Sequence, residues 1–442
     1  MTDPLSYLFG LEQFGIKFGL ENMGAIVARL GHPERAFRSV HIAGTNGKGS
    51  VTAMVDAGLR AAGHRSARYT SPHLVDLAER FVIDGRPVRT SDLVAAIDDI
   101  RAAVEGLLRD GTLQAHPTFF EVTTAVAFEL FRRAGVEIAV LEVGLGGRLD
   151  ATNVIAPVMT AITSIALDHE KYLGSTLADI AREKAGIIKP GVPVVVGDVD
   201  PEALHTIEAV AHERHAPMIR AWDGVEAVRL KPDTTYGGTR YDGAYGSTIR
   251  LRTPAHDYGE VVLGLCGDHQ IGNAVVAVRI LELLIDATGI AVPPAAVASA
   301  LAKPSWPGRL DRRNLSDGRE VLLDAAHNPA GAAALASYLN EHATGRLPLV
   351  FAAMRDKDVD GMLRALLPSV GSLVLTRASN RRSADPEVLA EHARRLAPDL
   401  PLTIAISPAE ALDIAWESSP RIIVAGSIFL LGDVMKEIGR GQ

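Results

Sequence analysis

Short apolar runs alternate with longer amphipathic segments along most of the chain from residue 37 onward. Apolar runs of this kind are typical of strands buried on both faces of a parallel sheet, and amphipathic segments are typical of the helices that cover it. The first half of the chain predicts strands at 38–43, 66–70, 137–143, 158–164 and 193–197, and helices at 50–62, 91–109, 119–134, 176–186 and 201–214. Before them, 4–36 predicts two short helices, the second at 22–30. The alternation predicts an α/β fold with a mostly parallel sheet.

The second half of the chain changes character twice. Residues 224–262 carry short alternating runs, which predict one or two hairpins with an exposed loop near 231–247. Helices are expected at 267–287 and 293–302, and the segment 303–309 is typical of a linker because it holds two prolines and a glycine. Beyond it the pattern predicts strands at 320–323, 347–353, 371–376, 402–406 and 421–425, and helices at 329–341, 357–367, 386–397, 408–418 and 428–439. We therefore expect two domains, 1–302 and 303–442, the second a smaller α/β domain of Rossmann-like type.

Composition narrows the class of protein. Of the 442 residues, 47% are apolar and 22% charged, which is ordinary for a globular protein with a large core. The net charge of −8 gives no basic field for nucleic acid, and the single cysteine, Cys266, excludes an intrachain disulfide. Residues 1–4 show no secretory signal, and the apolar stretch 422–431 is too short to span a bilayer. We expect a cytoplasmic protein that binds neither nucleic acid nor membrane.

One glycine-rich turn lies between the first predicted strand of the sheet and its helix, and reads Gly44-Thr45-Asn46-Gly47-Lys48-Gly49-Ser50. Glycines let backbone N–H groups turn inward, and the helix N-terminus adds positive partial charge, so this layout is typical of phosphate binding. Lys48 would reach the outer phosphates, and the Ser50 hydroxyl would bind Mg²⁺. Gly49 is unusual, because it separates the lysine from the serine. The alternative is a plain reversal of the chain.

Polar side chains follow three other predicted strands, at the sheet edge where ligands bind in parallel α/β folds. Ser71 follows the strand at 66–70, Glu142 lies at the end of a very apolar strand, and His169 follows the strand at 158–164. A carboxylate such as Glu142 is costly to bury unless it is paired or metal-bound, so we favour a magnesium ligand over a buried salt bridge. Ser71 could instead be a turn or cap residue, and His169 an ordinary loop histidine. Lys184, on the predicted helix 176–186, reads by itself as a solvent-exposed residue.

Taken together, the motifs resemble those of the folylpolyglutamate synthase/dihydrofolate synthase family, within the wider Mur-type ATP-dependent amide ligases. The resemblance covers nearly the whole chain. Two departures stand out: Ala325 lies where the family often has glycine, and 231–247 aligns with nothing. The segments that carry the resemblance are Ile16–Glu21, Gly44–Ser50, Ser71–Leu74, Thr118–Glu121, Glu142–Asn153, Thr163–His169, Glu183–Ile188, His269-Gln270, Asn273-Ala274, Trp306–Arg309, Asp324, His327-Asn328 and Asp356–Asp358.

The resemblance implies an enzyme that joins L-glutamate to a pterin-linked acid through an acyl phosphate, with ATP and two Mg²⁺ ions. It implies one Mg²⁺ near Ser50, Ser71 and Glu142, and a second at His169 and at Lys184, which carries a carbamate in similar proteins. Lys48, His169 and Lys184 would be the catalytic residues. The positions expected to bind nucleotide besides the glycine-rich turn are Asn273, Arg309, Asp324 and His327. The positions expected to contact the pteroate are Phe18, Gly19, Leu20, Thr118, Phe120, Leu149, Asp150 and Ala151, although by itself Phe120 reads as a core residue.

Two other functions remain open. A cell-wall Mur ligase would carry a further N-terminal domain, and a glycine-rich turn beginning at Gly44 leaves little room for it. A non-catalytic nucleotide-binding regulator would not need Lys48, Glu142, His169 and Lys184 together. The sequence does not decide between dihydropteroate and folate as substrate, and we expect both. We expect a monomer whose partners are pteroate or folate, L-glutamate and ATP.

Overall fold

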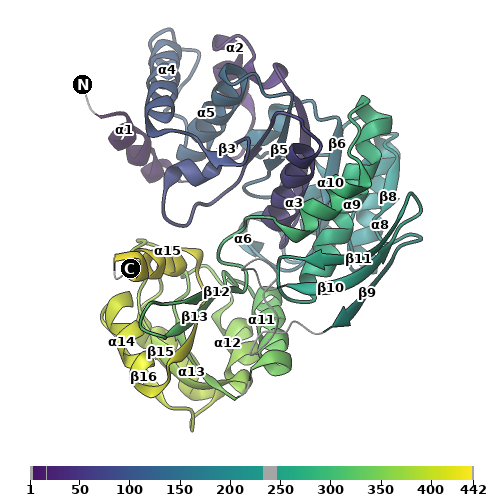
Figure 1. Cartoon of the computed structure of the whole chain (residues 1–442). Coiled ribbons are helices and arrows are strands. Elements are labelled where there is room, and N and C mark those ends of the chain that lie inside the picture. The colour runs from purple at the N-terminus through teal and green to yellow at the C-terminus, as the bar shows by residue number, and fades with distance from the viewer. Residues whose placement is uncertain (1–2, 16, 232–245, 344, 441–442) are drawn as a thin grey trace.

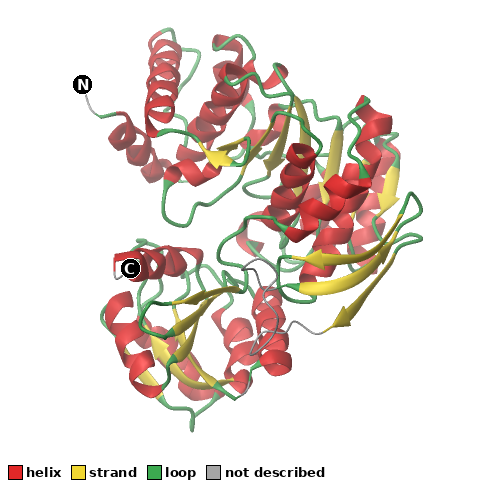
Figure 2. Ribbon diagram, viewed as in Figure 1, coloured by secondary structure: helices red, strands yellow, loops and turns green. Residues whose placement is uncertain are grey.

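Two α/β bodies, one above the other in Figure 1, make up the computed structural model, which describes residues 3–15, 17–231, 246–343 and 345–440. Each body is built around one large sheet, and Figure 2 shows helices against both sheets. Residues 303–310 connect the last helix of the upper body to the first strand of the lower one. The predicted domain boundary at 302/303 stays a prediction.

The upper sheet has eight strands. Five of its seven strand pairings are parallel. At one edge, β3 pairs antiparallel with both β2 and β4. In spatial order the strands are β4 (Arg86–Pro87), β3 (Phe81–Ile83), β2 (Ser66–Tyr69), β5 (Ile138–Glu142), β1 (Arg38–Ala43), β6 (Met159–Ile162), β7 (Val194–Val196) and β8 (Met218–Arg220).

Helices cover both faces of this sheet because neighbouring residues of each strand point to opposite sides. In β5, Ile138 and Val140 enter one core, whereas Ala139 and Leu141 enter the other. The first core is covered by α3 (Lys48–Ala61), α9 (His269–Thr288) and α10 (Pro294–Ala302). The second is covered by α1 (Pro4–Gly10), α2 (Glu21–Arg29), α4 (Thr90–Arg109) and α5 (Phe119–Arg133). Beyond β6 lie α6 (Glu170–Leu173), α7 (Leu177–Ala185) and α8 (Pro201–Glu213).

A small antiparallel sheet packs on the first core. Its strands are β9 (Glu226–Lys231), β10 (Ser247–Arg252) and β11 (Asp257–Leu263). Ile249 and Leu251 of β10 are fully buried in this core, as the alternating pattern predicts. The predicted exposed loop near 231–247 lies for the most part outside the described residues.

The lower sheet has six strands, and all but its edge strand β12 run parallel. The spatial order is β12 (Asp311–Asn314), β13 (Glu320–Leu323), β17 (Arg421–Ala425), β14 (Leu347–Phe351), β15 (Val370–Leu375) and β16 (Leu402–Ile404). One face packs against α11 (Pro329–His342), α12 (Val359–Leu366) and α13 (Pro386–Leu396), and the other against α14 (Pro408–Ser418) and α15 (Ile428–Arg440).

The predicted fold class is confirmed: two α/β units, each with a mostly parallel sheet. The sequence pattern missed the short strands β3, β4, β8 and β12 and the single-turn helix α6. Most predicted ends lie within one or two residues of the observed ones. Among the described residues no helix is long and apolar enough to cross a membrane.

Candidate active site

The glycine-rich turn lies between β1 and α3 and is held closely by its neighbours. A Cβ on Gly44 would lie 2.0 Å from the Oγ1 of Thr163, and one on Gly47 would lie 2.2 Å from the Oδ1 of Asn273. Gly47 also has φ of 85°, a conformation that side chains disfavour. The Thr163 hydroxyl donates to the carbonyl of Asn46 at 2.6 Å. The turn is therefore fixed in shape at the N-terminus of a helix, where backbone N–H groups and the helix dipole attract anions.

Two lysines point at this turn: Lys48, which is half-buried, and Lys184, which is buried. The Lys48 Nζ donates to the carbonyls of Gly44 at 3.0 Å and Thr45 at 3.1 Å, and the Lys184 Nζ donates to the same Gly44 carbonyl at 2.9 Å. Burial lowers the pKa of Lys48, and the carboxylate of Glu142 opposes this shift. Burial, with Lys48 beside it, lowers the pKa of Lys184 to about 7. The prediction of a solvent-exposed Lys184 from its helix alone is therefore wrong, because it is only 5% exposed.

Glu142, at the end of β5, is a buried carboxylate that makes no direct ion pair with a described residue. Its Oε2 accepts a hydrogen bond from the backbone N–H of Ser71 at 3.3 Å, and no described basic group lies within 4.0 Å. Burial raises its pKa, and Lys48 and Arg309 lower it. Ser50, 2% exposed, lies in the first turn of α3. A buried carboxylate without a direct ion pair, near a glycine-rich turn, is chemically suited to Mg²⁺.

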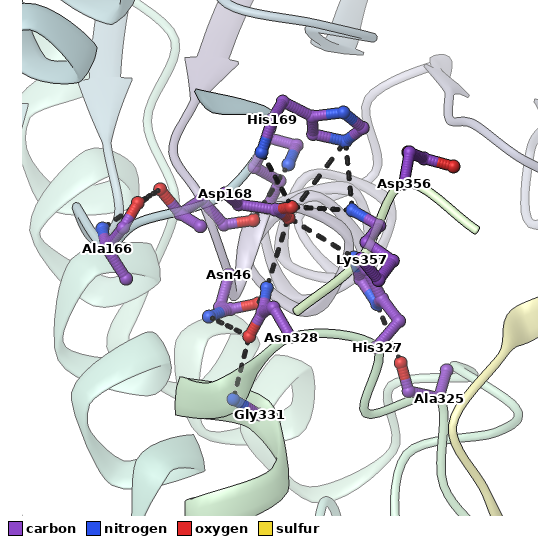
Figure 3. A network of polar contacts seen from close by, with 12 residues as sticks. Asn46, Ala166, Asp168, His169, Ala325, His327, Asn328, Gly331, Asp356 and Lys357 are labelled. Carbon is purple, nitrogen blue, oxygen red and sulfur yellow. Dashed lines mark hydrogen bonds and ion pairs between the residues drawn. The ribbon is translucent and has the colours of Figure 1, made fainter. Parts of the chain in front are cut away.

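A polar network joins the two bodies close to the turn (Figure 3). Lys357, from the loop after β14, donates to the Oδ1 of Asp168 at 2.6 Å, and both side chains are less than 10% exposed. The Lys357 Nζ also lies 3.2 Å from the Nε2 of His169, whose backbone N–H donates to Asp168 at 2.8 Å. The ammonium of Lys357 thus lies between a carboxylate and an imidazole, which are groups that also bind metal cations.

An amide pair makes a second link between the bodies. The Nδ2 of Asn328 donates to the Oδ1 of Asn46 at 3.0 Å, and the Nδ2 of Asn46 donates back at 3.3 Å. Asn328 also caps α11, because its Oδ1 accepts from the N–H of Gly331 at 2.8 Å. Its Nδ2 reaches Asp168 at 3.2 Å. The glycine-rich turn is therefore tied directly to the first helix of the lower body (Figure 3).

The two histidines of the network are neutral near pH 7. Burial lowers the pKa of both His169 and His327 to about 4. The Nδ1 of His327 donates to the carbonyl of Ala325 at 2.8 Å, which leaves its Nε2 3.7 Å from Asp168. Burial would raise the pKa of Asp168, but Lys357 and the two histidines lower it well below its usual range. The network thus contains one carboxylate, one ammonium and two neutral imidazoles, each of which has a nitrogen that can accept a hydrogen bond or bind a metal.

The remaining predicted nucleotide residues come from three separate elements. Asp324, after β13, accepts from the N–H groups of Leu310 at 2.8 Å and Ala326 at 2.9 Å. Burial lowers the pKa of Arg309, and the nearby carboxylates of Asp324 and Glu142 oppose this shift. Asn273, in the first turn of α9, touches the turn at Gly47 as described. Asn273 and Arg309 thus lie near the glycine-rich turn and Asp324 lies near Arg309. Their contact with nucleotide stays a prediction.

Phe18 and its neighbours lie on the surface of the upper body, just before α2. The ring of Phe18 is 45% exposed, and its centroid lies 5.9 Å from that of Tyr172 on α6, which is 40% exposed. Gly19 has φ of 134°, and Leu20 is the half-buried N-cap of α2. The two exposed rings are tilted by 50° to each other, and each offers an apolar face to a flat ligand. A pteroate contact by Phe18, Gly19 and Leu20 remains untested.

Thr118 and Phe120 begin α5. The Thr118 hydroxyl accepts from the N–H of Glu121 at 3.1 Å, and the Glu121 carboxylate accepts from the N–H of Thr118 at 2.7 Å, so the pair forms a capping box. The Phe120 ring is partly buried and presses on Gly144, where a Cβ would lie 2.4 Å from the ring Cζ. Thr118 therefore has a structural role here, and its predicted pteroate contact is an additional role that stays a prediction.

Leu149, Asp150 and Ala151 lie in the loop after β5. Leu149 is half-buried and Ala151 is 6% exposed. The carboxylate of Asp150 accepts from the N–H groups of Leu145 at 2.9 Å and Thr152 at 3.0 Å, so it holds its own loop together. A direct contact between Asp150 and the pteroate also stays a prediction.

Sequence reasoning assigned no role to several residues that the structure brings to the site. Asp168, Asn328 and Lys357 form the network between the bodies, and Tyr172 faces Phe18. A signal was available for Lys357, which follows a buried strand of the lower sheet, at the kind of edge already inspected in the upper one. What the pattern could not give was the relative position of the two bodies.

Comparison with known proteins covers nearly the whole chain. The family model described as "Mur ligase middle domain" matches residues 42–281, and "Mur ligase, glutamate ligase domain" matches 308–428. A dihydrofolate synthase/folylpolyglutamate synthase of Bacillus subtilis is 37% identical over 366 residues, 82% of this chain and 82% of the relative. The solved Mycobacterium tuberculosis folylpolyglutamate synthase complexed with ADP and AMPPCP has a TM-score of 0.88 and 36% identity, and the match covers 99% of this chain and 98% of that one. Escherichia coli FolC in complex with DHPP and ADP has a TM-score of 0.82 and 30% identity, with 100% and 98% covered.

Proposed function

The chain belongs to the dihydrofolate synthase/folylpolyglutamate synthases of the Mur ligase family, ATP-dependent ligases, and we propose that it adds L-glutamate to dihydropteroate and to folates through an acyl phosphate. One observation carries the proposal beyond the family: Lys48, Lys184, Glu142 and the Asp168 network surround one glycine-rich turn, where the two bodies meet.

The reaction needs an activated carboxyl group, because a free carboxylate is a poor acyl donor. In the proposed step a carboxylate oxygen attacks the γ-phosphorus of ATP, the bond to ADP breaks, and an acyl phosphate forms. The amine of glutamate then attacks the acyl carbon, the bond to phosphate breaks, and the amine loses a proton. Two anions meet in the first step, so neutralisation of charge should dominate catalysis. Lys48 and Arg309 are the cations that this chain offers to the phosphates.

Magnesium fits the donors present, and we propose two ions. Ser50, Ser71 and Glu142 would hold the first, which the burial of the Glu142 carboxylate without a direct ion pair supports. His169 and Lys184 would hold the second. When bound, Mg²⁺ neutralises and orients phosphate oxygens. No group of three or more His, Cys, Asp or Glu residues suited to a metal occurs in the described part of the chain. The donor sets proposed here instead include hydroxyls and a modified lysine.

We propose that Lys184 carries a carbamate, which would turn it into an anionic ligand. Only the neutral amine reacts with carbon dioxide: its nitrogen bonds to the carbon, and one proton leaves to solvent. A pKa lowered to about 7 by burial makes a large share of the amine neutral at physiological pH. The position of its Nζ beside the phosphate-binding turn, 2.9 Å from the Gly44 carbonyl, supports a role at the metal.

L-glutamate would bind in the lower body beside Lys357. A pocket of about 730 Å³ opens there between the ends of β14 and β15, and its lining includes Arg355, Lys357, Arg377 and His392. The N-termini of α12 and α13 lie at the same pocket, since their caps Asp358 and Asp385 line it. Arg377 and His392 pair with Asp385 and Asp360 of the same lining. A dicarboxylate would compete with these aspartates for the cations, and the helix N-termini would also attract it. Lys357 lines this pocket and also donates to Asp168. This contact supports a glutamate whose amine would lie on the side of the glycine-rich turn.

The deciding experiment offers the purified protein dihydropteroate and tetrahydrofolate separately, each with L-glutamate, ATP and Mg²⁺. We expect ADP release that depends on both glutamate and the pterin acid, with a product heavier by one glutamyl residue. Lys48→Met is the control, and it should abolish turnover. ADP release only with a nucleotide-sugar peptide would indicate a cell-wall ligase, and nucleotide binding without turnover would indicate a regulator. Monomeric state and cytoplasmic location stay predictions from the sequence.

A further inference from the structure

The glycine that separates Lys48 from Ser50 is explained by a contact from outside the phosphate-binding turn. Gly49 lies in the first turn of α3 and has no positive φ, so its backbone conformation does not demand glycine. A Cβ at this position would lie 2.1 Å from Cζ2 and 2.5 Å from Cε2 of Trp306, in the linker. No side chain larger than glycine fits there while the indole keeps its place. The linker is therefore packed directly on the helix that begins at the phosphate-binding turn.

Arg68, on β2, holds this part of the linker from the other side. Its guanidinium lies 5.7 Å from the centroid of the Trp306 ring, within the range of a cation–π contact, and its NH2 donates to the carbonyl of Ser305 at 3.4 Å. Its NH1 donates to the Oδ2 of Asp56 at 3.4 Å, and the two side chains are 9% and 0% exposed. Asp56 belongs to α3, two turns after Gly49. One helix thus supplies both the surface on which Trp306 packs and the carboxylate that anchors Arg68.

The indole has room to leave this position. Trp306 also lines a cavity of about 170 Å³, together with Arg68, Ser305, Pro307 and Arg309. Neither the indole Nε1 nor the Nε of Arg68 has a hydrogen-bond partner within the described ranges. Packing on Gly49 and the cation–π contact, rather than directional bonds of the indole itself, are what fix the ring.

We propose that Arg68 is a positioning residue for nucleotide binding: by seating Trp306 on Gly49 it sets the position of Arg309, three residues further along the linker. The proposal rests on the proposed function of the site, in which Arg309 contacts the nucleotide phosphates. Gly308, next to it, has φ of 73°, so the chain turns sharply between the seated indole and Arg309. A shift of Trp306 into the cavity would move the Arg309 guanidinium away from the phosphate-binding turn.

The structure supplies a matched control for Arg68. Arg60 also bonds to Asp56, from its Nε to Oδ2 at 3.2 Å, but it comes from α3 itself. Asp56 further accepts from the Ser66 hydroxyl at 2.6 Å. Arg68→Met and Arg60→Met each remove one arginine from the same carboxylate and leave it with other partners, so both variants should fold. Only Arg68→Met releases the linker.

The test measures ADP affinity by calorimetry and the mobility of Trp306 by acrylamide quenching of its fluorescence. Trp222 and Trp416, the other two tryptophans of the chain, are replaced by Phe in every variant. For Arg68→Met we expect ADP affinity to fall by about tenfold or more and quenching of Trp306 to rise. For Arg60→Met both should stay within about twofold of the parent. In turnover, Arg68→Met should raise KM for ATP far more than it lowers kcat.

ADP affinity and quenching in Arg68→Met equal to the parent would overturn the proposal, as would equal losses in both variants. Trp306→Leu provides a second route: with Arg68 intact, it should reproduce the loss of ADP affinity, and unchanged affinity would refute the role of the indole. A failure of the proposed function would give a different result from a failure of this inference. A parent protein that binds ADP but forms no glutamyl product leaves this binding test intact, and only the identity of the reaction would then be wrong.

Discussion

The amine of Lys184 gives the sharpest quantitative prediction, because burial lowers its pKa from 10.5 to about 7. At pH 7 an ordinary lysine is neutral to about 0.03%, whereas Lys184 should be neutral to about 50%, a gain of roughly a thousandfold. Between pH 6 and pH 8 the neutral share should rise from about 10% to about 90%. Since only the neutral amine reacts with carbon dioxide, carbamylation at fixed dissolved carbon dioxide should rise steeply over the same range.

The assay follows the carbamate carbon by NMR in protein equilibrated with ¹³C-labelled carbon dioxide, and the Lys184 Nζ by ¹⁵N labelling of lysine. Lys184→Arg should lose the carbamate signal. In Lys48→Met the titration midpoint of Lys184 should move upward, because Lys48 is the second cause of the lowered pKa. The carbamate signal at pH 7 should then fall, since fewer neutral amines are present and the product anion loses a neighbouring cation.

Two results would refute this reasoning at different steps. A Lys184 titration with its midpoint near 10 would mean that burial at the phosphate-binding turn does not lower the pKa. A midpoint near 7 without any carbamate signal at pH 8 would leave the electrostatics intact and remove the proposed modification.

Three further predictions concern single contacts. Glu142→Gln should raise the free energy of unfolding by about 1 kcal/mol, because burial disfavours its charge, and should abolish the gain in ADP affinity on adding Mg²⁺; an equal gain in both proteins would contradict the metal role. Lys357→Met should lower the free energy of unfolding by about 3 kcal/mol, and adding Asp168→Asn should recover part of it in urea denaturation; additive losses would mean that the pair is not coupled. Gly144→Ala should displace the Phe120 ring and weaken binding of dihydropteroate by about tenfold in calorimetry; unchanged affinity would remove Phe120 from the substrate site.

Most of the architecture could be predicted because its strands are continuous apolar runs. The run that ends at Glu142, for example, is buried on both faces in the fold, as its pattern indicates. Two of the missed strands lack this signal: β12 reads Asp311-Arg312-Arg313-Asn314, and β4 is two residues that include Pro87. A third, β3, is apolar but only three residues long. Edge strands such as β12 and β4 form because a neighbour offers free backbone groups, and their own side chains say little about it.

Some residues of the candidate site could likewise be predicted from the sequence, and others could not. The glycine-rich turn could be recognised because its chemistry lies within seven consecutive residues, Gly44 to Ser50. A role for Lys184 in the site could be predicted only from the family resemblance, since an amphipathic helix gives no sign that one lysine faces inward. Asp168 and Lys357 lie 189 residues apart in the chain, and their ion pair depends on how the bodies dock. Gly49 was noticed as unusual, but its cause, Trp306, lies in another segment.

The paired amides of Asn46 and Asn328 carry no net charge, so acidity and salt concentration should scarcely alter the way they recognise each other. Each amide presents one donor beside one acceptor, and the match exists for a single mutual orientation. An aspartate on either side would set two acceptors against one another. The orientation of the glycine-rich turn relative to the lower body is therefore specified by the geometry and direction of neutral hydrogen bonds. It should persist over a wide range of pH and ionic strength.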